Sequence, residues 1–402
     1  MLIDLEQFND VTVVLLSLGI MLLAGFLVTR ITKRFKLPDV TGYIISGILL
    51  GPYVLNIIPK AFISNIGFIG DLALAFVAFD VGLFLRKGSF KKSGLQSIIV
   101  TLFEAIVPGI LVTLTMSLIF SFSWSFSLLL GAISTATSPA STVMTINEYD
   151  ARGEFVYILL QVVALDDAVG LILFSVASAV ASALELGAVD FSHFFLPLLY
   201  NLLMLFLGFI AGVLLKKLLE PKGRSKGNRL ILVIIMLLFI TGISSILEIS
   251  PLLAAMFFSV TYINITDDKD LYDELDGFTP PIMSMFFILS GINLDVPALF
   301  SLGAIGVAYF IVRIIGKYIG AYLGSSVAGL KRSTRNYLGF ALLPQAGVAI
   351  GLAFIGERML PTDVGSTLMT IILASSVLYE LIGPVSAKWA LIQAGTIKKE
   401  KL

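Results

Sequence analysis

Residues 164–171, ALDDAVGL, place two carboxylates side by side inside an apolar run that covers residues 155–184. An apolar run of about 17–25 residues crosses a bilayer as a helix, so this run is long enough to span. A charge inside a membrane helix costs about 2.5–3.5 kcal/mol even on a permissive insertion scale. Asp166 and Asp167 are therefore candidates for a functional site.

The composition of the whole chain indicates an all-α polytopic membrane protein. Of its 402 residues 57% are hydrophobic and 13% are charged, and the mean hydropathy is +0.99. Globular proteins carry about 25% charged residues. Without cysteine, and with a single histidine, the chain offers no disulfide, no thiolate metal site and no multi-histidine metal centre. We expect no resident cofactor, no nucleic-acid partner and no cleaved signal peptide.

Apolar runs predict thirteen transmembrane segments, several of them short or interrupted by Pro and Gly. Their approximate ranges are 11–29, 40–57, 66–85, 95–120, 126–146, 155–184, 194–215, 230–247, 250–265, 279–294, 298–327, 336–356 and 365–391. With the N-terminus outside, the odd-numbered connections, the C-terminal tail and Lys388 hold 23 of the 27 Lys and Arg residues. Excess positive charge marks cytoplasmic loops, so we predict that the N-terminus lies outside and the C-terminus in the cytoplasm.

The two halves of the chain resemble each other. Gly82 matches Gly291 and Glu104 matches Arg313 at one separation, and Pro139 matches Pro344 at nearly the same one. The matched segments lie seven apart, so their directions across the membrane are opposite. Such inverted repeats are typical of alternating-access transporters. We predict repeats over residues 1–190 and 229–402, with residues 191–228 as the linking segment.

Proline interrupts the matched fifth and twelfth segments. Pro139 lies in STATSPAST beside Thr137 and Ser138, and Pro344 precedes Gln345 in LLPQAGVAI. Proline removes a backbone donor and frees carbonyl groups, which survive in a membrane only where they are buried in protein or face a wet cavity. Paired breaks of this kind point to a binding site at the midplane, where oxygen ligands suit small cations.

The paired acids favour an exchange site. Neighbouring helical residues point about 100° apart, so Asp166 and Asp167 face different surroundings. At roughly 6 Å and an effective dielectric near 20, their charges repel by about 3 kcal/mol. One carboxyl group therefore holds either a proton or a cation, which is the competition that a cation/proton antiporter needs.

Buried basic residues need compensating charge. Arg313 stays protonated under all physiological conditions, and Lys317 lies one turn away on the same helical face. Glu104 occupies the position that matches Arg313 in the other half. We predict an Arg313–Glu104 ion pair at the repeat interface, with Asp166 as the rival partner.

With these residues in place, the chain resembles monovalent cation/proton antiporters, in the branch that holds bacterial sodium/proton exchangers and glutathione-gated potassium-efflux systems. The stretches that carry the resemblance are LPDVTGYIISGILLGP, STATSPAST, ALDDAVGL, RIIGKYIGAYLG and LLPQAGVAIGL, distributed over nearly the whole chain. The double Asp after a broken helix is specific, and the glycine patterns are weaker.

The resemblance implies a homodimer in a bacterial or archaeal cytoplasmic membrane, with a dimerisation domain, a mobile core and crossed discontinuous helices. It makes Asp167 the residue that binds Na⁺ or a proton, with Asp166 beside it and Thr137 nearby. Potassium-efflux relatives carry Gln before the Asp and append a nucleotide-binding domain, so Asp-Asp favours Na⁺ or Li⁺. Electrogenic relatives tend to have Lys where Arg313 stands, which favours electroneutral exchange.

Other functions remain open from sequence. A potassium/proton antiporter fits the same features, and a sodium-coupled organic solute symporter shares crossed broken helices. The exchangeable carboxyl group argues against a channel. Enzymatic activity is not expected, because no nucleophile–base pair, metal cluster or phosphate loop stands out.

Overall fold

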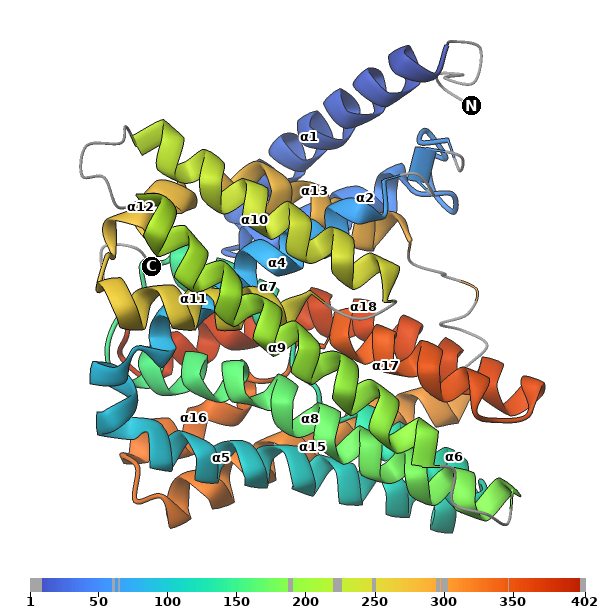
Figure 1. Ribbon diagram of the computed structural model, residues 1–402. Coiled ribbons are helices and arrows are strands. Elements are labelled where there is room, and N and C mark those ends of the chain that lie inside the picture. Colours follow the sequence, from blue (N-terminus) through green and yellow to red (C-terminus); the bar gives the residue numbers. More distant parts are fainter. Residues whose placement is uncertain are drawn as a thin grey trace.

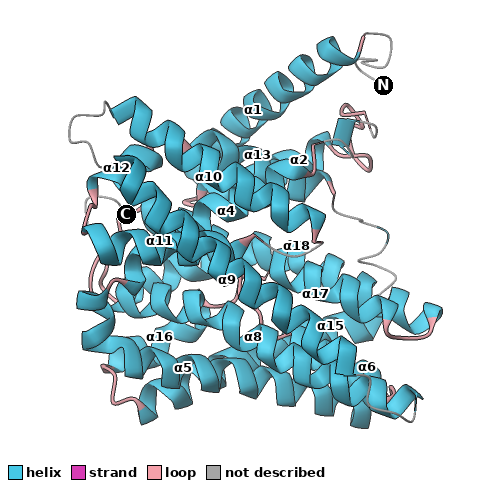
Figure 2. Ribbon diagram, viewed as in Figure 1, coloured by secondary structure: helices cyan, strands magenta, loops and turns pink. Residues whose placement is uncertain are grey.

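The structure, a computed structural model, describes residues 9–59, 62–63, 66–186, 191–219, 226–247, 251–293, 297, 303–345 and 347–397. The described residues form helices and loops without a β-strand (Figures 1 and 2). This agrees with the all-α fold predicted from composition.

One set of helices, which we call the first helix group, lies mostly in the upper part of Figure 1, although one of its members, α9, runs down to the lower right. It contains α1 (Asp10–Arg34), α2 (Asp39–Leu50), α4 (Phe68–Gly82), α9 (Phe191–Leu219), α10 (Lys226–Ile246), α11 (Leu252–Thr266), α12 (Asp270–Asp276) and α13 (Thr279–Ile292). Glycines allow α2 and α13 to touch through their backbones. A Cβ on Gly47 would overlap the carbonyl oxygen of Ile288, and one on Gly291 would overlap that of Ile44. Close approach at small residues is a common basis of helix association in membranes.

The second helix group occupies the lower part of Figure 1. It contains α5 (Lys87–Leu114), α6 (Trp124–Ile133), α7 (Pro139–Glu148), α8 (Glu154–Leu186), α15 (Gly303–Val327), α16 (Arg332–Ala341), α17 (Gly347–Arg358) and α18 (Thr362–Gln393). Its apolar core joins α5, α6, α8, α15, α17 and α18 through buried residues such as Val112, Phe126, Phe174, Tyr309, Leu352 and Leu368. The two groups meet where α2 and α4 pack against α7, α8 and α18, and where α9 packs against α8.

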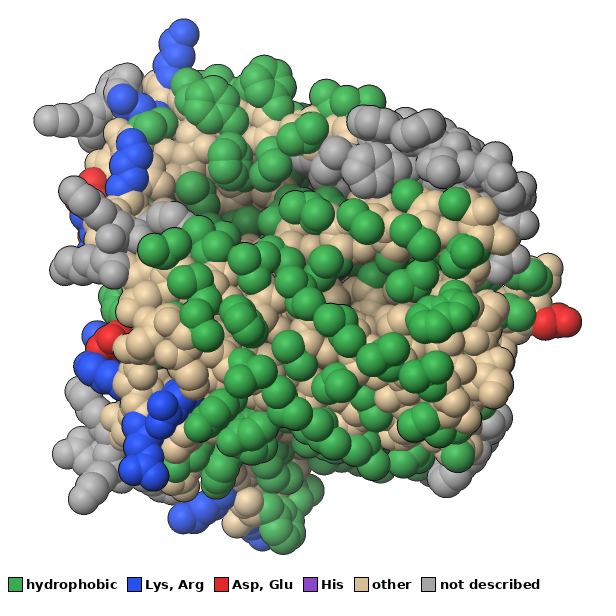
Figure 3. Space-filling view, turned by 90° about the horizontal axis from the view of Figure 1, so that it is seen from below, with side chains coloured by type: hydrophobic (Ala, Val, Ile, Leu, Met, Phe, Trp, Pro, Cys, Tyr) green, Lys and Arg blue, Asp and Glu red, His purple; other side chains and the backbone are tan. Residues whose placement is uncertain are grey.

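Length and composition make eight of the described helices able to cross a membrane, and five shorter apolar helices accompany them. Hydrophobic side chains cover the middle of the face in Figure 3, whereas Lys and Arg gather along one end. This distribution fits a surface that contacts lipid along its middle. The chain is a multi-pass membrane protein.

The predicted segments coincide with described helices over most of their lengths, although the number of crossings stays a prediction. Segments 126–146 and 336–356 each divide into two half-helices, α6 and α7 in the first and α16 and α17 in the second. Both breaks therefore occur where proline predicted them. The division into repeats at residues 190 and 229 stays a prediction.

Candidate functional site

The two broken segments meet at their unwound stretches, residues 134–138 and 342–345. Proline is the first residue of α7, where its missing N–H and fixed φ suit a helix start. The backbone N–H of Ser138 donates to the carbonyl oxygen of Pro344 at 2.9 Å. The Gln345 amide donates to the Ile133 carbonyl at 2.9 Å. These bonds hold one break against the other.

Arg313 of α15 fastens both breaks. Its Nε donates to the carbonyl of Ser134 at 2.8 Å, and its Nη2 to that of Ala136 at 2.7 Å. Its Nη1 donates to the carbonyl of Leu343 at 2.8 Å. The guanidinium also lies 4.4 Å from the ring centre of Tyr379, in a cation–π contact. Arg313 is fully buried, so its charge is compensated by carbonyl dipoles and an aromatic face.

Lys317, one turn further along α15, gathers acidic and hydroxyl groups. Its ammonium lies 2.6 Å from Oε2 of Glu104 and 3.4 Å from Oδ2 of Asp166. It also donates to the Thr137 hydroxyl at 2.7 Å and to the carbonyl of Thr135. Lys317, Glu104 and Asp166 are completely buried. A buried pair of this kind survives only with close, hydrogen-bonded geometry, which these contacts provide.

A row of glycines on α15 brings Glu104 to this position. A Cβ on Gly316 would lie 2.5 Å from the Cα of Pro108 on α5, and one on Gly320 would lie 2.7 Å from the Cα of Glu104. Glycines four residues apart lie on one face of a helix. The motif RIIGKYIGAYLG therefore sets α5 and α15 close enough for Glu104 to reach Lys317.

The predicted ion pair between Arg313 and Glu104 is wrong. Glu104 pairs with Lys317, and Arg313 binds backbone carbonyls instead. The physical reason is the shape of each cation. The guanidinium fork can satisfy several carbonyls spread over two breaks, whereas the compact ammonium suits convergent single oxygens.

The carbonyl groups at the breaks are predicted from the sequence to serve as ligands of a small cation, but the structure pairs several of them with basic side chains. The carbonyls of Ser134, Thr135, Ala136 and Leu343 accept from Arg313 or Lys317, so they are not free to bind a transported cation. Several oxygens beside them are buried without a hydrogen-bond partner. They are Oδ1 of Asp166, Oδ1 of Asp167, and the hydroxyls of Ser138 and Ser141. These are hard oxygen ligands of the kind that Na⁺ prefers.

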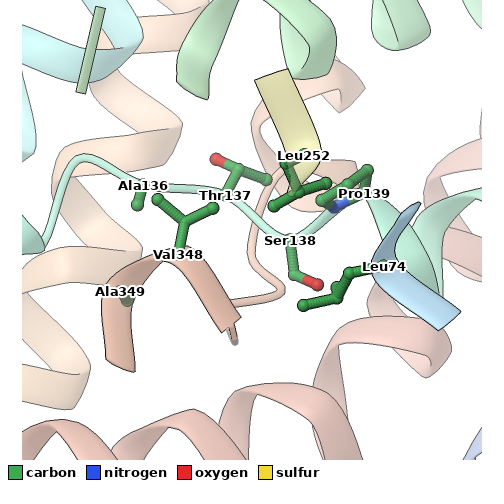
Figure 4. Close-up of a pocket in the computed structure, with 8 residues that line it drawn as sticks. All are labelled: Leu74, Ala136, Thr137, Ser138, Pro139, Leu252, Val348 and Ala349. Atoms are coloured by element: carbon green, nitrogen blue, oxygen red, sulfur yellow. The ribbon is translucent and has the colours of Figure 1, made fainter. Parts of the chain in front are cut away.

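A small, narrow cavity adjoins the first break. Its walls come from both helix groups: Thr137, Ser138 and Pro139 from the break, and residues of α4, α11 and α17 around them. Figure 4 shows Thr137 and Ser138 turned to opposite sides of the unwound stretch. The Thr137 hydroxyl is engaged by Lys317, which leaves Ser138 as the hydroxyl without a partner at this wall.

The charges at the site do not balance. Glu104, Asp166 and Asp167 are buried together, and Lys317 is the cation that contacts two of them. Asp167 is only 6% exposed, and the acids that Lys317 contacts are Glu104 and Asp166. Uncompensated carboxylates in a dry site must take up protons or cations. Among the described residues, no group of three His, Cys, Asp or Glu side chains is arranged to hold a resident metal ion.

The transmembrane sodium/hydrogen exchanger family model matches residues 18–391. The chain belongs to the sodium/hydrogen exchanger family. A "probable Na(+)/H(+) antiporter 3" of Methanocaldococcus jannaschii is 23% identical over 378 residues, which cover 90% of this chain and 93% of that protein. A Na(+)/H(+) antiporter of Enterococcus hirae is 21% identical over 91% of this chain and 96% of its own length.

The fold of this exchanger-family member is also similar to a solved structure. The sodium proton antiporter MjNhaP1 from Methanocaldococcus jannaschii superposes with a TM-score of 0.76 at 18% identity. The match covers 96% of this chain and 98% of MjNhaP1. This similarity shows the fold. The roles of the site residues follow from the hydrogen bonds and distances described above.

Sequence reasoning missed several residues that support the site. Tyr379 stacks on Arg313 and donates to the carbonyl of Phe310 at 2.9 Å, and Tyr309 donates to Gln345 at 3.1 Å. Tyr309 stands four residues before Arg313, so a helical-face count from Arg313 would have found it. Nothing local in the sequence marks Tyr379, because its role depends on how α18 packs.

Proposed function

We propose that this exchanger-family member is a sodium/proton antiporter that uses Asp167 as its exchanging carboxyl group. One observation carries the proposal: at the two broken helices, one ammonium pairs with two buried carboxyl groups and leaves a third buried carboxyl group, that of Asp167, without a basic partner among the described contacts. Relatives over nearly the whole chain carry the name Na(+)/H(+) antiporter. Protons and Na⁺, with Li⁺ as a further substrate, are the proposed cargo, and no enzymatic reaction is expected.

The two aspartates have different tasks in this proposal. Asp166 directs Oδ2 to Lys317 and is held in place by it. Asp167 has an oxygen without a partner and no lysine contact, so it is free to bind a proton or a cation in turn. The hydroxyl of Ser138, also unpartnered, supplies a further oxygen ligand from the cavity wall. Occupation by either cargo removes the uncompensated charge and permits the site to change its accessibility.

We propose one-for-one exchange, with a different residue supporting it from the one that sequence suggested. Lys317 is bonded to two carboxylates, a carbonyl and a hydroxyl. Loss of its proton would leave Glu104 as an uncompensated buried charge, which is strongly unfavourable. Lys317 therefore keeps its proton through the cycle, and Asp167 alone exchanges. Exchange in proteoliposomes would then be insensitive to an imposed membrane potential.

The proposed setting is a bacterial or archaeal cytoplasmic membrane, with the N-terminus outside and the C-terminus in the cytoplasm. The gathering of Lys and Arg at one end of the molecule supports this orientation. By its resemblance to the family, we also propose a homodimer that works by alternating access.

Everted vesicles test the proposal. A pH gradient is formed, Na⁺, Li⁺ or K⁺ is added, and dequenching of a pH-sensitive dye reports exchange. We expect a response to Na⁺ and Li⁺, its loss in Asp167→Asn, and its retention in Asp363→Asn, which alters an exposed acid at the start of α18.

The other readings give different results in the same vesicles. A response to K⁺ alone would identify a potassium/proton antiporter. No response to any of the three cations would refute antiport, and Na⁺-driven uptake of an organic solute would then identify a symporter. Full activity in Asp167→Asn would exclude Asp167 as the exchanging group.

A further inference from the structure

A fourth buried acid, Glu380 of α18, has no part in the mechanism above. Its side chain is 1% exposed. Its Oε2 accepts a hydrogen bond from the hydroxyl of Ser290 on α13, and its Oε1 has no hydrogen-bond partner. α18 belongs to the second helix group and α13 to the first. This bond therefore crosses the interface between the two groups.

Glu380 has no cationic partner among the side chains that the structure describes. The charged residues with described side chains on the helices that pack against α18 are Asp39 of α2, Glu148 of α7, Arg313 and Lys317 of α15, Arg332 and Arg335 of α16, and Glu357 of α17. On α18 itself they are Asp363 and Lys388, and α13 carries none. Among these described side chains, none forms an ion pair or hydrogen bond with Glu380. A carboxylate buried with one hydroxyl partner and no cation is strongly unfavourable, so the group holds a proton here.

The position of Glu380 connects it mechanically to the site. Its neighbour Tyr379 stacks on Arg313, which fastens both breaks. One turn further, a Cβ on Gly383 would lie 2.6 Å from the ring of Pro344, so α18 packs directly on the second break. Any displacement of the broken helices relative to the first group must carry α18 with it.

Ser290, the partner of Glu380, lies where α13 packs closely against α2. Ser290 precedes Gly291, at which the backbones of α13 and α2 touch. The hydroxyl of Thr41 on α2 also lies 3.4 Å from the carbonyl of Leu381, the residue after Glu380. The first group thus presents a rigid α2–α13 edge, and Glu380 attaches to it.

We propose that Glu380 is a proton-binding site separate from Asp167, and that its bound proton, by removing an uncompensated buried charge, keeps the second helix group fastened to the first where Ser290 donates to Glu380. Release of this proton to water leaves a carboxylate that cannot stay in the closed interface. The interface then loosens, and the movement that exchange requires becomes faster. The proton on Glu380 regulates the cycle and is not part of the transported cargo. This inference rests on the proposed antiport for its effect on rate, whereas the proton site itself does not.

Difference infrared spectroscopy tests the proton site without transport. The purified wild-type chain and Glu380→Gln are compared at neutral pH in detergent, in the region where protonated carboxylic acids absorb. We expect a carboxylic-acid band in the wild type that is absent from Glu380→Gln and shifts in Ser290→Ala. Ser284→Ala serves as the matched control, because its hydroxyl binds the carbonyl of Pro280 on its own helix. Identical spectra for the wild type and Glu380→Gln would overturn the inference.

Exchange rates measured in vesicles across pH test the fastening. Glu380→Gln keeps the shape and the hydrogen bond but cannot ionise, so we expect it to be slower than the wild type at alkaline pH only. Ser290→Ala lacks the bond, so we expect it to be faster at acidic pH only. The expected change is about fivefold, which corresponds to one hydrogen bond of about 1 kcal/mol. Profiles that superpose on the wild type would overturn the fastening, whereas an inactive wild type would instead contradict antiport.

Discussion

Replacement of Lys317 by Met tests whether this lysine, and not Arg313, compensates the buried acids. Methionine keeps much of the apolar stem but removes the ammonium. Glu104, which lies 2.6 Å from that ammonium and is fully buried, then loses its only ion-pair partner among the described residues. Breaking one side of a buried ion pair costs about 3–5 kcal/mol. The carbonyl of Thr135 and the hydroxyl of Thr137 lose a donor as well.

A second replacement separates the ion pair from simple loss of packing. The double variant Lys317→Met/Glu104→Gln removes both charges, and replacing both partners of a buried pair is often nearly neutral. We expect the double variant to recover at least half of the stability that the single variant loses. Asp166, at 3.4 Å from the ammonium, remains uncompensated and accounts for the rest.

Unfolding in detergent, followed by the fluorescence of Trp124 and Trp389, measures these differences. Lys331→Met is the matched control, because Lys331 also pairs with a glutamate, Glu154, but both side chains are more than half exposed. Exposed pairs contribute about 0–1 kcal/mol. If Lys317→Met lost no more stability than Lys331→Met, or the double variant were as unstable as the single, the assignment of Lys317 would fail.

Three further changes test other parts of the structure. Gly320→Ala would press a Cβ against the α5 backbone at 2.5 Å, so we expect lower stability and slower exchange, whereas Gly242→Ala, in open space, should leave both unchanged. Arg313→Lys supplies one donor group where the breaks need a fork, and we expect exchange to fall at least tenfold in vesicles while binding of Na⁺ in calorimetry weakens. Glu148 is the last residue of α7. Its burial raises the pKa of its carboxyl group, and the nearby Asp39 carboxylate raises that pKa further. Ionisation then opposes folding, so stability should fall as pH rises above about 4, and Glu148→Gln should show a smaller fall in melting temperature between pH 5 and pH 8.

Much of the architecture could be predicted because the membrane restricts the choices. Apolar length located the helices, and proline located both breaks, since each signal is local in the sequence. The double Asp stood out because its cost in an apolar run is large. Glu380 lies in the predicted segment 365–391 and meets the same criterion, but it is absent from the site predicted from the sequence, and its partner on α13 depends on packing between distant helices.

The partner of Glu104 could not be predicted because it depends on an axial shift. Arg313 and Lys317 lie on one face of α15 and are separated by four residues, about 6 Å along the axis. Matching the two halves of the chain places Glu104 and Arg313 at equivalent positions. The contacts of Gly316 and Gly320 with α5 determine where Glu104 lies along the axis of α15. At that position its nearest cation is Lys317.

The separation of the two cations has a consequence for the exchange itself. Arg313 is compensated by carbonyl dipoles and by Tyr379, so it fixes the breaks without neutralising an acid. Had it paired with Glu104, Lys317 would have been left for the two aspartates, and the site would have had less need of a further cation. With Lys317 shared between Glu104 and Asp166, the carboxyl group of Asp167 keeps an oxygen without a partner. The need for a transported proton or Na⁺ at Asp167 therefore follows from where α15 directs its two basic side chains.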